Sequence, residues 1–203
     1  DRYPIEAGAL LPGKTEVVLS KNLKEAGECA FYASPKYCVV KLSGKGENVI
    51  QDGMLFNKKK TELILALEAK TGDYHIPKTV RRIHAYAFSA VSQGVEPTNS
   101  ATGRIWIPEG VTVLEQGTFR NCFWLKSLSL PSTIERIEAG AWSCISLDQP
   151  NTGNGLRNLV IKAKNPPEII GKQKTLRYIN VPNSSIADYE EALSGKVGYK
   201  KLY

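Results

Sequence analysis

The residue types that most often carry enzyme chemistry are few in this chain and form no recognisable motif. The two histidines, His75 and His84, have no serine or cysteine nucleophile and acid at the spacing of a known catalytic family. Alternation along a predicted strand points His84 outward. Glu190 and Glu191 are typical of a solvated helix face, and neither GxxxxGK[ST] nor GxGxxG occurs. We therefore expect no enzyme activity, no catalytic residue and no cofactor.

The four cysteines also lack the spacing of a metal site. Cys29, Cys38, Cys122 and Cys144 form no CxxC pair, and no histidine stands at ligand spacing to them, so we expect no zinc. Cys122 and Cys144 follow equivalent aromatic residues of neighbouring repeats and should lie close together. We favour two buried thiols over a disulfide, and the disulfide remains the alternative.

A repeated apolar pattern is the strongest signal in the chain. The stretch from Ile107 to Leu130, IPEGVTVLEQGTFRNCFWLKSLSL, has close copies that begin at Ile76 and at Leu130. A weaker copy begins at Leu19, where Ser20 replaces the proline. Four copies of one unit predict a solenoid, in which each repeat packs against its neighbours.

Each repeat is predicted to contain two walls. Leu125, Leu128 and Leu130 have the LxxLxL spacing of a leucine-rich repeat strand. Alternation points Leu128 and Leu130 into the core and Ser127 and Ser129 to the outside.

The second wall, the turn and the aromatic position follow in every copy. Val111 and Leu114 form the second wall, and Gly117, Gly140 and the segment 85–87 mark a tight turn. After this turn comes one aromatic residue per copy, which should stack into a buried column: Phe31, Phe88, Phe119 and Trp142.

The remaining segments are assigned around these repeats in one domain, 1–203. Residues 1–17 form an N-terminal cap, 18–182 the repeats with a β-hairpin at 49–67, and 183–203 a C-terminal cap. Two Gly-, Pro- and Asn-rich loops, 89–104 and 143–158, should emerge on the same face of the solenoid and flank the third repeat. In the cap, Ser185 and Asp188 resemble a capping box, and Gly195 ends a short helix.

Together these motifs resemble the BspA-type leucine-rich repeat family from Leu19 to Leu193. The resemblance is carried by IPxxVxxIxxxAF, by LxxLxLP, by the hairpin DGMLFNKKKTELILAL and by INVPNSSIADYEEAL. It implies a mainly β leucine-rich repeat solenoid with a right-handed superhelix. It also implies a secreted or cell-surface protein of anaerobic bacteria, or an outer-membrane-anchored precursor, and adhesin-like binding. The family shares no ligand motif, so no site residue is transferred from it.

The candidate binding residues come from strand alternation alone. The concave face should present Arg104, Trp106, Ser127, Ser129, Asn158, Tyr178 and Asn180. Trp106 beside Arg104 is typical of an interface hot spot, unless the 89–104 loop covers it. We expect a protein or glycan partner at a cell surface, and the alternative is a structural spacer without a ligand.

Composition and charge limit the other classes of partner. The 203 residues are 42% hydrophobic with a net charge of +7, and the lysines are scattered, so we expect no nucleic-acid partner. No apolar run approaches the roughly 20 residues of a membrane span. The chain begins at Asp1 without a signal-like segment, so we interpret it as a mature or trimmed form, and we expect a monomer.

Overall fold

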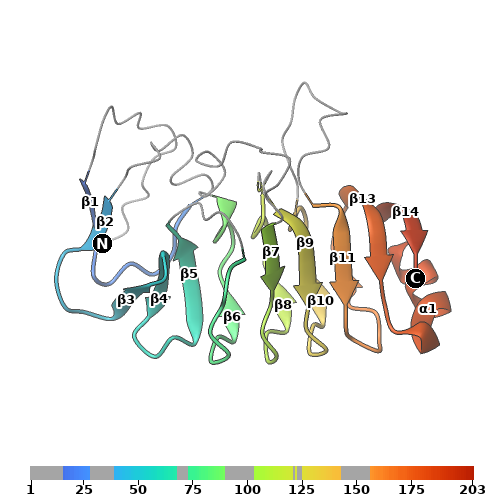
Figure 1. The fold of residues 1–203 in the computed structure, drawn as a ribbon, viewed down its shortest axis with the longest axis horizontal. Helices are drawn as coiled ribbons and strands as arrows, with labels where there is room; N and C mark the ends of the chain where they lie inside the picture. The colour runs from blue at the N-terminus through green and yellow to red at the C-terminus, as the bar shows by residue number, and fades with distance from the viewer. Residues whose placement is uncertain are drawn as a thin grey trace, which may run out of the picture.

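One parallel sheet of five strands runs along the length of the solenoid. The computed structural model describes residues 16–27, 39–67, 73–89, 103–120, 122, 125–142 and 156–203. The strands, in spatial order, are β7 (Gly103–Trp106), β9 (Leu125–Leu130), β11 (Asn158–Ile161), β13 (Gln173–Asn180) and β14 (Val197–Leu202). They lie side by side in Figure 1, and all neighbouring pairs are parallel. Each turn of the chain therefore adds one strand beside the last.

A second parallel ladder forms the opposite wall. It consists of β8 (Val113–Leu114), β10 (Arg136–Ile137) and β12 (Glu168–Ile169). Leu114, Ile137 and Ile169 stand opposite one another and are buried, which confirms the predicted second wall. The described residues, with one α-helix among them, form a β-solenoid of about six turns, which confirms the predicted solenoid.

Apolar side chains from both walls fill the space between them. The register aligns Ile105, Leu128, Leu159 and Ile179 across four strands, and all are at most 1% exposed. This is the consequence of LxxLxL spacing repeated once per turn, since equal spacing stacks equal residues. Each buried side chain of this size contributes about 1.5–3 kcal/mol through removal from water.

The predicted aromatic column is present in the described repeats. The rings of Phe88 and Phe119 stack with centroids 5.0 Å apart and an interplanar angle of 28°. Tyr74 meets Phe88 edge to face at 5.4 Å, and Trp142 is 2% exposed. Phe31 lies outside the described residues. The predicted stacking is therefore confirmed for Phe88 and Phe119, and the predicted burial is confirmed for Trp142.

A left-handed residue precedes each aromatic position. Gly117 and Gly140 have φ of 60° and 62°, and Gly171 has 64° in the following turn. Tyr86 occupies the same position in the second repeat with φ of 60°, although it is not a glycine. Its ring covers Gly117 so closely that a Cβ on Gly117 would lie 2.4 Å from a ring carbon.

The N-terminal part differs from the predicted single hairpin. β1 (Glu16–Leu19) pairs in parallel with β2 (Val39–Leu42), and three antiparallel strands follow. These are β3 (Asn48–Gln51), β4 (Met54–Asn57) and β5 (Glu62–Ala66). The run 49–56, predicted as one arm, is two strands, because Asp52 (φ 49°) and Gly53 (φ 68°) form a two-residue turn with both angles positive. β5 then pairs in parallel with β6 (Arg82–Ile83) and joins this meander to the solenoid.

The C-terminal cap contains the predicted helix and an additional strand. Helix α1 (Ile186–Leu193) buries Tyr189 and Leu193, and Gly195 follows with φ of 69°. The capping box is wrong, since Ser185 makes no side-chain cap hydrogen bond. A 3₁₀ turn (Asn183–Ser185) leads into the helix instead, and it leaves Ser185 buried at 2% exposure. The prediction omitted β14, which lies beside α1 in Figure 1.

Candidate interaction face

The outward residues of the five-stranded sheet form two rows across the strands. The first row is Arg104, Ser127, Asn158, Tyr178 and Lys201, each opposite the next. The second row is Trp106, Ser129, Val160 and Asn180, and it continues to Tyr203. Tyr203 is placed there because its N–H donates to the Ile179 carbonyl at 2.9 Å. We call these ten residues the strand face. It contains all seven residues that the sequence predicted as candidate binding residues.

Three aromatic side chains on the strand face are open to solvent. Trp106 is 42% exposed, Tyr178 37% and Tyr203 42%. Ser129 differs from the prediction, because only 8% of it is exposed. It stands between Trp106 and Val160, and cross-strand neighbours lie close enough for these larger side chains to shield a serine.

A shallow open hollow lies at the C-terminal half of the strand face. Its volume is about 360 Å³, and its lining residues are Ser127, Asn158, Val160, Tyr178, Asn180 and Tyr203. The Tyr178 and Tyr203 rings are 6.1 Å apart and tilted by 45°. Lys201 Nζ lies 4.4 Å from the centroid of the Tyr203 ring, in a cation–π contact. These groups are suited to stacking and hydrogen bonding with a ligand rather than to covalent catalysis.

One buried acceptor belongs to Asn158, a residue that lines this hollow. The Oδ1 atom of Asn158 is inaccessible to solvent and has no hydrogen-bond partner within the described part of the chain. Buried polar atoms normally have a partner, since leaving one unpaired costs about 1–3 kcal/mol. Asn158 is therefore the residue of the strand face whose hydrogen bonding is least satisfied by its described neighbours.

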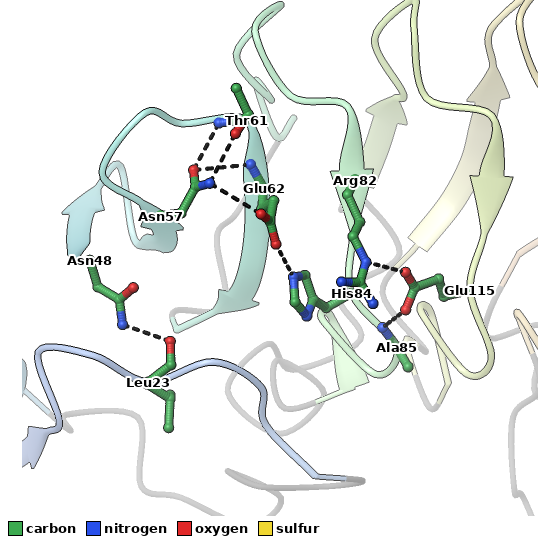
Figure 2. Close-up of polar contacts among 9 residues, drawn as sticks. All are labelled: Leu23, Asn48, Asn57, Thr61, Glu62, Arg82, His84, Ala85 and Glu115. Carbon is green, nitrogen blue, oxygen red and sulfur yellow. Dashed lines mark hydrogen bonds and ion pairs between the residues drawn. The ribbon is translucent and has the colours of Figure 1, made fainter. Parts of the chain in front are cut away.

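A second polar cluster lies between the meander and the solenoid, and Figure 2 shows it. His84 Nε2 lies 2.8 Å from Glu62 Oε2, and His84 is 7% exposed. The prediction that His84 points outward is wrong, because β5 pairs with β6 and brings Glu62 over the residue after Ile83. Asn57 holds the connection between β4 and β5 in place. Its Oδ1 atom accepts hydrogen bonds from the backbone amides of Thr61 and Glu62.

Glu115 ties the second repeat to the third. It accepts from Arg82 Nε at 2.6 Å and from the Ala85 amide at 2.9 Å (Figure 2). The hydrogen bond to Glu115 raises the pKa of Arg82, which stays protonated. The Glu115 carboxylate and the Glu62–His84 pair therefore hold neighbouring turns together.

Glu109 makes the next tie along the chain. Partial desolvation raises the pKa of Glu109, but hydrogen bonds from the Ser132 hydroxyl and amide outweigh that effect, and the net pKa is lowered. An ionised Glu109 thus links the proline turns of two successive repeats.

The cysteines and acids of the described segments show no metal site. No group of three His, Cys, Asp or Glu residues there is close enough to hold an ion. Cys122 carries a buried thiol, and its S–H donates to the Phe88 carbonyl at 3.3 Å. Cys29, Cys38 and Cys144 lie outside the described residues, as do the loop segments 90–102 and 143–155. Within the same limits, no helix is long and apolar enough to cross a bilayer.

The sequence prediction missed Lys201 and Tyr203 on the strand face. The signal was present, since Tyr199 and Leu202 repeat the LxxL spacing of the earlier strands. Tyr199 stands opposite Leu176 and Leu202 opposite Ile179, so the same spacing gives the same register.

Comparison with known proteins identifies the repeat. Residues 67–164 match the family described as BspA type leucine rich repeat region, in six copies. These residues belong to the BspA-type leucine-rich repeat family. The family match begins directly after β5 and ends after β11, so it covers the most regular turns.

Two solved structures match this chain, and the first of them, with a TM-score above 0.5, shares its fold. The pneumococcal vaccine antigen PcpA is 18% identical with a TM-score of 0.57, over 93% of this chain and 55% of that one. A leucine-rich repeat protein from Eubacterium ventriosum is also 18% identical, with a TM-score of 0.40, over 85% and 52% of the two chains. The chain therefore spans about half the length of each. A search of curated proteins found no match.

Proposed function

We propose that this BspA-type repeat domain is a secreted or surface-displayed interaction module that binds a protein or a glycan through the strand face. The observation that carries the proposal is the exposure of Trp106, Tyr178 and Tyr203 on one regular sheet surface. Exposed aromatic residues beside arginine are enriched among interface hot spots, because they bury a large area at low entropic cost.

The other polar contacts of the described residues support a binding role rather than catalysis. The Glu62–His84 and Arg82–Glu115 pairs connect adjacent turns, so their charged groups are used in holding the fold. The similar fold of a pneumococcal protein described as a vaccine antigen supports display at a surface.

A binding screen with paired variants tests this proposal. The wild-type chain, an Arg104→Ala/Trp106→Ala variant and a Lys78→Ala/Lys164→Ala control are applied to a glycan array and to immobilised matrix proteins. We expect at least one target to bind both the wild-type chain and the control variant. The same target should not bind the Arg104→Ala/Trp106→Ala variant. Equal binding of the two variants would show that this face is not the binding surface.

The screen also separates the module from a structural spacer. A spacer would bind none of the targets, with all three proteins folded to the same extent by circular dichroism. That result would refute a binding role for the domain by itself.

A further inference from the structure

The five strands of the strand face carry charge of one sign. Their sequences contain six basic residues and no aspartate or glutamate: Arg104, Lys126, Lys174, Arg177, Lys200 and Lys201. Glu115, Glu135, Glu138 and Glu168 of the same turns lie in or next to the opposite ladder, and Glu109 lies in the proline turn after β7. Asp73 is the exception at the N-terminal edge, where the bridge from Tyr74 to Ile105 places it opposite Arg104. The wall of the strand face is therefore basic, whereas the opposite ladder carries both signs, with Arg136 in β10.

Four basic residues form a continuous row across β9, the residue before β11, β13 and β14. Lys126, Arg157, Arg177 and Lys200 each occupy the first position after the leading apolar residue of the LxxL pattern. The Arg157 amide donates to the Lys126 carbonyl at 3.1 Å, and the Arg177 amide donates to the Arg157 carbonyl at 2.9 Å. Lys200 lies beside Arg177, because Tyr199 is opposite Leu176 and Lys201 opposite Tyr178. We call these four residues the basic rim.

This row has an electrostatic cost that the described residues do not offset at its C-terminal end. Neighbouring strands lie about 4.8 Å apart, and like charges directly opposite destabilise a sheet. Arg177 and Lys200 are both exposed, and neither forms an ion pair within the described segments. A partner with regularly spaced negative charges would remove this repulsion on binding.

We infer that the strand face binds a linear anionic polysaccharide, whose acidic groups contact the basic rim and whose sugar rings pack on Tyr178 and Tyr203. This inference rests on the proposed function and names the class of ligand. The hollow of about 360 Å³ is near the lower limit for small-ligand sites and is lined by hydroxyl, amide and aromatic groups. Ser127 and Asn180 line the hollow with a hydroxyl and an amide group, which can exchange hydrogen bonds with sugar hydroxyls.

The same geometry favours a polysaccharide over the other polyanions. Tyr178 and Tyr203 are 6.1 Å apart at 45°, so no flat nucleic-acid base fits in parallel between them. An acidic protein surface would match the basic rim but would not require a hollow lined by hydroxyl and amide groups. Both classes are included below as competitors.

Biolayer interferometry with the immobilised full chain tests the ligand class. The probes are chondroitin sulfate, polygalacturonate, dextran, oligo(dT) and polyglutamate, each at low and at physiological salt. We expect binding of at least one acidic polysaccharide, weakened by salt, with no binding of neutral dextran. Chondroitin sulfate against polygalacturonate distinguishes sulfate from carboxylate as the recognised group.

Matched variants test the position of the site. Each cation near an anionic surface contributes about a fivefold change in affinity, so Arg177→Gln/Lys200→Gln should bind roughly 20-fold more weakly. Lys78→Gln/Lys164→Gln removes the same charge outside the strand face and should stay within about twofold. The single variant Lys200→Gln, on the exposed edge strand, replaces the double variant if circular dichroism shows that the latter is unfolded.

Three outcomes would overturn the inference. They are no binding to either acidic polysaccharide, equal weakening by the rim and control variants, and oligo(dT) or polyglutamate binding as tight as that of the polysaccharides. A different result would separate this inference from the proposed function. If neither acidic polysaccharide binds, but a matrix protein binds the wild-type chain and not the Arg104→Ala/Trp106→Ala variant, the ligand class is wrong and the proposed function stands.

Discussion

Replacement of Gly117 by alanine tests whether the repeats are in register at the turn. Gly117 has φ of 60°, and an added Cβ would lie 2.4 and 2.5 Å from two ring carbons of Tyr86. The chain must therefore accept both a strained backbone and a steric overlap between successive repeats. The cost of each can be worked out separately.

The strained backbone and the steric overlap should contribute comparable amounts to the destabilisation by Gly117→Ala. A non-glycine residue in the left-handed region costs about 1–2 kcal/mol, and overpacking of a filled site costs about 1–3 kcal/mol. Gly117→Ala should thus lower the free energy of unfolding by about 2–5 kcal/mol. Gly195→Ala is the matched control, because its φ is 69° and nothing lies within 4 Å of the added Cβ. The control should lose only the backbone part, about 1–2 kcal/mol.

Urea unfolding followed by circular dichroism measures both values, and a double-mutant cycle identifies the clash. In a Tyr86→Ala background the ring is gone, so Gly117→Ala should cost no more than Gly195→Ala does. If Gly117→Ala and Gly195→Ala are equally destabilising in the wild-type background, Tyr86 does not pack on the glycine. The same conclusion would follow if removing the Tyr86 ring left the cost of Gly117→Ala unchanged.

Three further predictions concern the core. Phe119→Ala should lower the free energy of unfolding by about 3–5 kcal/mol in denaturant melts, because it empties part of the aromatic column. Trp106→Ala, at an exposed position, should change this free energy by no more than about 0.5 kcal/mol. A loss below about 1 kcal/mol for Phe119→Ala would contradict the stacking. Cys122 should react with a thiol reagent only at the rate of unfolding, since it is 2% exposed; fast modification of this thiol in the native protein, resolved by peptide mapping, would show that it is accessible. Burial raises the pKa of Tyr189 to about 12, against about 10 in the unfolded chain, so the unfolded state loses this proton first and stability should fall as pH rises from 10 to 12. Tyr189→Phe should remove this part of the alkaline decline, and an unchanged pH profile would count against the buried phenol.

Repeat spacing explains why the register was predictable. Counting from Phe119 and Trp142 to the following strands placed Leu128 and Leu159 opposite each other, as the structure has them. The turns differ in length because of their loop insertions, but each strand carries the same apolar spacing, so the local pattern is sufficient to place it. The same argument placed the seven candidate residues on one face before any coordinate was known.

The errors occur where contacts come from outside the repeat. His84 was assigned to solvent by strand alternation, but β5 from the meander lies beside it and supplies Glu62. Ser129 was assigned outward correctly but is shielded by its cross-strand neighbours. Local periodicity describes which side of a strand a residue occupies and carries no information about what packs there.

The sequence by itself determined the repeating unit, the two walls, the buried aromatic residues and the residues that share the strand face, because each depends on spacing along the chain. Only the tertiary structure decided that β14 extends the sheet, that Lys126, Arg157, Arg177 and Lys200 form one row, and that Tyr178 and Tyr203 border a common hollow. Residues that are 20 to 30 positions apart in the chain become neighbours through strand pairing. Their combined charge and shape therefore exist only after the solenoid has formed.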